Sequence, residues 1–149
     1  LAVARGDADT VTILREAKAN PAILDVSKST ALHVAVANRQ AHVAAIFVFM
    51  YPYNADIFAS QNSKGKTAMQ QAIFHDDIRM IDLLGNSGAL STWEHRSTAP
   101  LHYATVHGSP RALIALLKCA KCVPTAPDCP DGITALHAAA AHNRVRAIE

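Results

Sequence analysis

Three cysteines and one histidine near the carboxyl end are of the residue types that bind zinc. Cys119 and Cys122 form a Cys-x-x-Cys pair, Cys129 follows, and His137 could supply a fourth ligand. Three thiolates and one imidazole make a common structural zinc set. No second Cys-x-x-Cys pair accompanies them, and an odd number of cysteines argues against a disulfide framework. We therefore expect reduced thiols in a proline-rich connector, a protein that folds without metal, and no cofactor.

Nucleophilic and nucleotide chemistry have little support in the sequence. No Gly-x-Ser-x-Gly motif, which presents a serine nucleophile on a sharp turn, occurs. Gly65-Lys66-Thr67 is similar to the end of a phosphate-binding loop, but Ser60 stands where such a loop has its first glycine. We therefore expect no catalytic residue in this chain and no enzymatic activity.

A short pattern that recurs along the chain accounts for both Gly65-Lys66-Thr67 and His137. It combines a threonine with a leucine, a histidine and an alanine. The threonine hydroxyl can cap a helix by accepting a hydrogen bond from a free N–H of the first turn. The copies are Thr30-Ala31-Leu32-His33-Val34-Ala35, Thr67-Ala68-Met69-Gln70-Gln71-Ala72, Ala99-Pro100-Leu101-His102-Tyr103-Ala104 and Thr134-Ala135-Leu136-His137-Ala138-Ala139. The last alanine of each copy, together with Ala2, gives steps of 33, 37, 32 and 35 residues. This period is typical of a solenoid with two short helices per unit.

The pattern predicts where the helices of the central units lie. We expect helices near Ala31–Asn38 and Ala41–Met50 in one unit, and near Ala68–Phe74 and Asp77–Leu84 in the next. The step of 37 places extra residues in the loop after Met50. The helix Ala41–Met50 is apolar nearly all round, and two explanations remain open. Its long side chains wrap over neighbouring helices, or they form a patch that a partner or another segment covers.

These copies resemble the ankyrin repeat, whose pattern is Gly-x-Thr-Pro-Leu-His-x-Ala-Ala, a mid-unit glycine, and a second helix with Val-x-x-Leu-Leu. Gly6 and Gly108 fill the mid-unit glycine, whereas Arg39, Asp76 and Asn143 replace it. The resemblance covers essentially the whole chain. It implies an all-α ankyrin-repeat solenoid of helix-turn-helix units with short β-hairpin fingers. Residues 1–149 then form one domain, with a partial unit 1–24, units 25–61, 62–93 and 94–128, and a partial unit 129–149.

The composition of the chain and its two ends limit which class of protein it can be. With 14 basic and 12 acidic residues the formal net charge is +2, which does not indicate a nucleic-acid partner. The longest apolar run, Val43–Met50, is far shorter than the roughly 20 residues that span a bilayer. We expect an intracellular protein, cytoplasmic with the nucleus as the alternative, and monomeric in isolation. Because both ends fall inside a repeat, we expect the chain to be a window from a longer protein.

The resemblance also implies a function and assigns residues to it. Proteins of this family recognise other proteins through a concave surface of fingers and first helices. The positions that match this surface are Lys64, Lys66, Phe74, His75, Trp93, His95, Arg96, Val106, His107, Asp131, Ile133 and His142. The positions that match the framework are Thr30, His33, Thr67, His102, Thr134 and His137.

Two alternatives to a plain binding module stay open. The chain could be the ankyrin portion of a larger enzyme or effector whose catalytic domain lies outside it. It could also be an inhibitor similar to the IκB family, because Leu14-Arg15-Glu16-Ala17-Lys18 and the segment from Ala22 to Val36 resemble the first units of such proteins. The acidic tail expected of that family is absent from this sequence. In every case the expected partner is another protein, and not nucleic acid or membrane.

Overall fold

The computed structural model describes residues 2–51, 54–87, 100–107 and 109–119, together with residues 137, 140 and 141. Over these residues the chain folds into nine helices and no strand. The helices are α1 (Ala2–Arg5), α2 (Ala8–Glu16), α3 (Ala31–Ala37), α4 (Ala41–Met50), α5 (Ala55–Ala59), α6 (Ala68–Phe74), α7 (Ile78–Asn86), α8 (Pro100–His107) and α9 (Pro110–Lys118).

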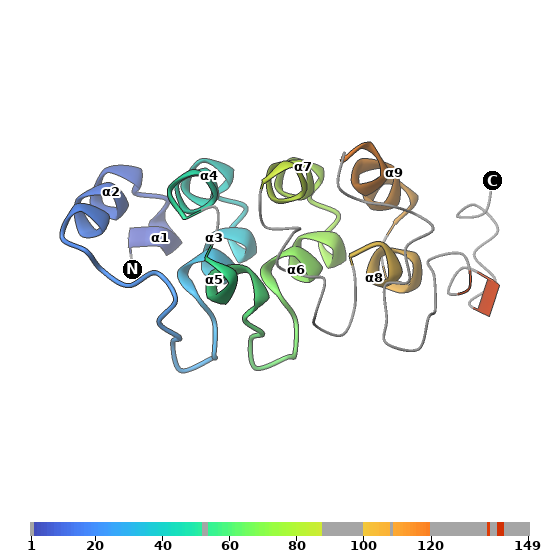
Figure 1. Ribbon diagram of the computed structural model, residues 1–149, viewed down its shortest axis with the longest axis horizontal. Helices are drawn as coiled ribbons and strands as arrows, with labels where there is room; N and C mark the ends of the chain where they lie inside the picture. The colour runs from blue at the N-terminus through green and yellow to red at the C-terminus, as the bar shows by residue number, and fades with distance from the viewer. Residues whose placement is uncertain are drawn as a thin grey trace.

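The helices stack in two layers (Figure 1). One layer holds the first helices α1, α3, α6 and α8, and the other holds the second helices α2, α4, α7 and α9. Each of these eight helices packs against its neighbours in the same layer and against its pair in the other, whereas α5 packs against α6. The loops at residues 25–29 and 62–66, which we call fingers, project from the first layer away from the second. This arrangement confirms the predicted all-α solenoid.

The repeated threonine begins the first helices as a cap. Thr30 Oγ1 accepts a hydrogen bond from the His33 N–H at 3.4 Å, and the Thr30 N–H donates to His33 Nδ1 at 3.2 Å. Thr67 and Gln70 make the same reciprocal pair, with distances of 3.3 and 3.0 Å. Both are capping boxes, which satisfy two backbone donors that a helix start leaves unpaired. Glutamine therefore replaces the repeat histidine without losing its local role.

The extra residues after Met50 form helix α5, which the sequence pattern does not predict. Asn54 caps this helix by accepting hydrogen bonds from the N–H groups of Asp56 and Ile57. Ile57 is 0% exposed and Phe58 is 1% exposed, so both side chains belong to the hydrophobic core. The insertion that the 37-residue step indicates is therefore a packed element rather than a surface loop.

The fingers are closed by hydrogen bonds rather than by paired strands in the part of the chain that the structure describes. Asn62 and Lys66 are joined by a backbone hydrogen bond of 3.0 Å, and Gly65 turns the chain with a φ of +69°. Asn62 Oδ1 also accepts from the N–H groups of Lys64 and Lys66, at 2.9 and 3.2 Å. The Ser63 N–H donates to the carbonyl of Ser27 at 2.8 Å, which ties one finger to the next.

The turn between the two helices of a unit uses the left-handed backbone region, which favours glycine. Gly6 has a φ of +73° there, and a Cβ on it would meet Gln40 Oε1 at 2.5 Å. Arg39 and Asp76 adopt φ angles of +54° and +51° at the equivalent places in the next two units. The carboxylate of Asp76 accepts a hydrogen bond from the Ser109 hydroxyl and lies 3.6 Å from Arg111 NH1. Asp76 thus connects its own turn to the start of α9.

Helices α7 and α9 approach closely because Gly85 has no side chain. A Cβ built on Gly85 would lie 2.4 Å from the Cys119 sulfur. Cys119 is buried, and its thiol donates to the carbonyl of Ala115 at 3.4 Å. Burial, with a smaller contribution from the charge of Asp82, raises the pKa of the Cys119 thiol. This cysteine is therefore a small core side chain.

Helix α4, whose apolar sequence leaves two explanations open, is buried on one side and exposed on another. Val43, Ala44, Phe47 and Val48 are buried against the neighbouring helices. Phe49, in contrast, is 75% exposed, and Met50 is also exposed. Part of this helix is core, and part is an uncovered apolar face in the layer of second helices. No helix among the described residues is long and apolar enough to cross a membrane.

Candidate functional site

Six of the predicted recognition residues lie in the described part of the chain, and they gather on the fingers and the ends of the first helices. These six are Lys64, Lys66, Phe74, His75, Val106 and His107. We call them the finger-helix surface. Trp93, His95, Arg96, Asp131, Ile133 and His142 lie outside the described residues.

Phe74 is held between a finger and the end of its own helix. It is the last residue of α6, and 55% of it is exposed. Helical side chains lean toward the helix amino end, so its ring is directed toward the finger that precedes α6. Lys66 Nζ lies 3.4 Å from the centroid of this ring, and the His75 ring packs edge-on at a centroid distance of 5.5 Å. An exposed aromatic is therefore fixed by a cation–π contact and an aromatic contact.

The next first helix continues this surface. Val106 and His107 at the end of α8 match Phe74, the last residue of α6, and His75, which follows it, and these two helices pack against each other. The exposed His107 ring lies 4.7 Å, centroid to centroid, from the ring of the buried Tyr103 one turn earlier. The finger-helix surface therefore presents two units in register, each with its last helical residues positioned by neighbouring side chains.

His33 links consecutive units as well as capping α3. Its Nδ1 accepts from Thr30, so Nε2 carries the proton and donates to the carbonyl of Lys66 at 3.0 Å. That bond joins one unit to the finger of the next and helps to place Lys66. Burial lowers the pKa of His33, while the Lys66 carbonyl and the charge of Asp25 oppose the shift. His33 is therefore held neutral at its core position.

The lowered pKa of His33 predicts that acid destabilises the fold through this residue. Above about pH 6.5, the pKa of histidine in the unfolded chain, neither the folded nor the unfolded chain binds a proton at His33. Below that pH, the unfolded chain binds this proton more readily than the folded chain. Stability should therefore fall as the pH drops from about 6.5. Urea midpoints between about pH 7.5 and about pH 5 measure the effect. His33→Gln, which keeps a capping box like that of Gln70, should show a smaller fall, and an equal fall would contradict the assignment.

The other framework positions differ from one unit to the next. His102 is half-buried, and its Nδ1 is a buried atom without a hydrogen-bond partner. The sequence has Ala99 where a capping threonine would stand, so no hydroxyl is available there. Thr134 lies outside the described residues. His137 is helical but exposed, unlike the buried His33. The finger that follows covers His33.

Cys119, the first residue of the candidate zinc set, faces the core at Gly85. Cys122 and Cys129 lie outside the described residues. Among the described residues no group of three or more histidine, cysteine, aspartate or glutamate side chains could hold a metal ion. The geometry of Cys119 therefore fits a packing role.

Paired helices stacked in two layers, with capped first helices and fingers on one side, define a helical-repeat solenoid. The family model for ankyrin repeats, which spans three copies, matches residues 1–92, and the chain belongs to the ankyrin-repeat family. Ankyrin repeats are in general protein-interaction modules. The division into five units and the likeness to IκB proteins stay predictions.

Proposed function

We propose that this chain binds a partner protein through the finger-helix surface and carries no chemistry of its own. The observation that supports this most is the exposed Phe74 ring, held between Lys66 and His75. The framework does not require an aromatic at this place, because Ala37 occupies it in the preceding unit. A rigid aromatic on a rigid scaffold buries much area on binding and loses little conformational entropy.

The charges around Phe74 indicate the chemistry of the partner. Lys28, Lys64 and Lys66 lie on the two described fingers. The one acidic residue of these fingers, Asp25, already accepts from the N–H groups of Ser27 and Ser29, both at 2.8 Å. We therefore propose that the partner places an apolar side chain against Phe74 and carboxylates around it. Complementary charges of this kind speed association and fix orientation.

Replacing Phe74 by alanine should weaken binding of this partner by more than about 1 kcal/mol and leave the free energy of unfolding almost unchanged. The affinity is measured by calorimetry against a partner captured with the intact chain. Ile114→Ala is a matched control. Ile114 is also a large apolar side chain that is about half exposed (53%), but it lies in α9, in the other layer. If Phe74→Ala and Ile114→Ala have equal effects, the finger-helix surface is not the binding site.

A further inference from the structure

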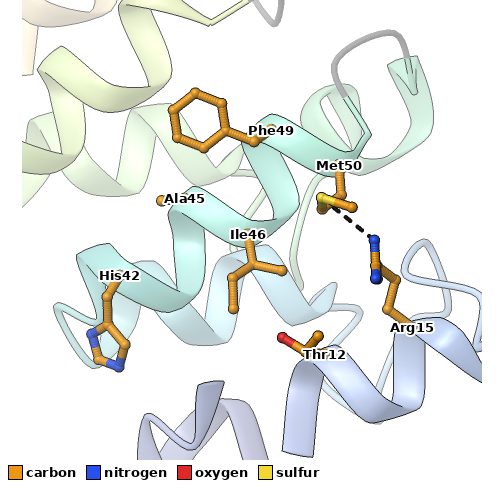
Figure 2. A pocket seen from close by; sticks show the side chains of 7 residues that line it. All are labelled: Thr12, Arg15, His42, Ala45, Ile46, Phe49 and Met50. Atoms are coloured by element: carbon orange, nitrogen blue, oxygen red, sulfur yellow. Dashed lines mark hydrogen bonds between the residues drawn. The ribbon is translucent and has the colours of Figure 1, made fainter. Parts of the chain in front are cut away.

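A pocket of about 310 Å³ lies between α2 and α4, in the layer of second helices (Figure 2). Its lining residues are Thr12, Arg15, His42, Ala45, Ile46, Phe49 and Met50. Ile46 and Met50 of α4 point toward Thr12 and Arg15 of α2, while Phe49 points away from α2. The pocket is built from the second helices, whereas the finger-helix surface is built from the fingers and first helices. The proposed function therefore does not use it.

The apolar character of this pocket is specific to α4. Residues 41–50 include no aspartate, glutamate, lysine or arginine. Each of the other second helices places a charge on its exposed side, for example Asp9 in α2, Arg79 in α7 and Arg111 in α9. The stacking of units therefore does not require an exposed phenylalanine and methionine here. Exposed apolar side chains grouped around a hollow are typical of binding sites.

Arg15 is the polar group of the pocket whose contacts are long. The Thr12 hydroxyl donates to the Ala8 carbonyl at 2.9 Å, and His42 Nε2 contacts the Gly6 carbonyl at 2.8 Å. Arg15 NH1, in contrast, lies against the Met50 sulfur at 3.6 Å, and NH2 is 3.5 Å from Glu16 Oε1. Its buried Nε has no hydrogen-bond partner. A thioether is a weak acceptor, and an arginine–carboxylate bond is normally about 2.7–2.9 Å long.

A second apolar pocket adjoins the first at Arg15. It has a volume of about 120 Å³, and Arg15 and Ile46 line both pockets. Leu14, Phe47 and Tyr51 supply other parts of its wall. Arg15 and Ile46 therefore form the boundary that the two pockets share, and a ligand that fills both contacts this boundary. The terminal nitrogens are the donors that such a ligand can reach, because Nε is buried.

We propose that this outer face binds a peptide segment of a partner protein that carries two apolar side chains with an aspartate or glutamate between them. The apolar side chains fill the two pockets, and the carboxylate bonds to the terminal nitrogens of Arg15 in place of the Met50 sulfur. A second copy of this chain is a poor occupant, because a symmetric contact through this face would bring Arg15 close to its own equivalent. The site is independent of the finger-helix surface.

The test is selection of short random peptides displayed on phage against the intact 149-residue chain. Enriched peptides should share an apolar–acidic–apolar pattern. Synthetic versions should bind Arg15→Gln at least about tenfold more weakly than the native chain. Changing the acidic residue of the peptide to its amide should weaken binding to the native chain by the same factor. The same change should not weaken binding to the Arg15→Gln variant any further. Phe74→Ala should bind these peptides normally, which separates this site from the proposed function.

Three results would overturn the proposal. Selection could yield no peptide that binds in solution, or only peptides without an acidic residue. Binding could be insensitive to both Arg15→Gln and Phe49→Ala in variants that melt like the native chain. Sedimentation could also show a concentration-dependent dimer that Phe49→Ala abolishes, which would assign this face to a second copy of the chain.

Discussion

Phe58→Ala is expected to lower the free energy of unfolding by about 3–5 kcal/mol, as for other buried phenylalanines replaced by alanine. Phe58 is among the largest fully buried side chains, and it lies in α5 beside the equally buried Ile57. Its removal would leave a cavity where α5 meets the stacked units, because α5 packs against α6. Urea denaturation followed by circular dichroism at 222 nm, the usual helix signal, measures the change.

Phe49→Ala provides a matched control for this prediction. The residue type and the replacement are the same, but Phe49 is exposed on α4. Surface substitutions usually change stability by no more than about 0.5 kcal/mol. If the Phe58 variant were no less stable than the Phe49 variant, α5 would not be part of the core, and the insertion after Met50 would be a surface loop after all.

Gly85→Ala should cost about 1–3 kcal/mol, and Cys119→Ala in the same chain should recover most of that loss. A Cβ on Gly85 overlaps the Cys119 sulfur, and the hydrogen bond to the Ala115 carbonyl and the surrounding core hold that sulfur in place. Without the sulfur, the nearest atom is the Cys119 Cβ at 3.4 Å, a tolerable contact. Alanine would then also gain its advantage over glycine in a helix, about 1 kcal/mol.

A double-mutant cycle tests this pair directly. Unfolding free energies are measured for the native chain, both single variants and the double variant. The expected coupling favours the double variant, so its loss is smaller than the sum of the two single losses. Additive losses would mean that Gly85 and Cys119 do not share the contact that brings α7 and α9 together.

The features that the sequence predicts well depend on residues close together in the chain. Helix α6 spans Ala68–Phe74 and α4 spans Ala41–Met50, as expected from the repeat. Thr30 and Thr67 begin helices because a capping box needs only the three residues that follow it. Stacking then follows, because a unit with one apolar face must bury it against the next unit.

The features that the sequence does not predict depend on contacts between distant residues. Arg15 and Met50 are 35 positions apart, and no local pattern places a guanidinium against a thioether. The sequence predicts Cys119 to be a reduced thiol in a connector, but it does not predict that the absent side chain of Gly85 accommodates that thiol in the core. Helix α5 shows the same limit, since the repeat period reveals that residues are inserted but not where they pack.

We expect Asp76 to affect how cooperatively this stack of units unfolds. Its left-handed backbone weakens its own turn relative to glycine, while its carboxylate strengthens the interface through Ser109 and Arg111. In a linear array, the free energy within each unit and the coupling between neighbours are separate quantities. Less stability within a unit and more coupling across its boundary make neighbours fold and unfold together. A strained residue in a turn can thus make adjacent units unfold together as one block, which would keep the proposed finger-helix surface across both of them intact.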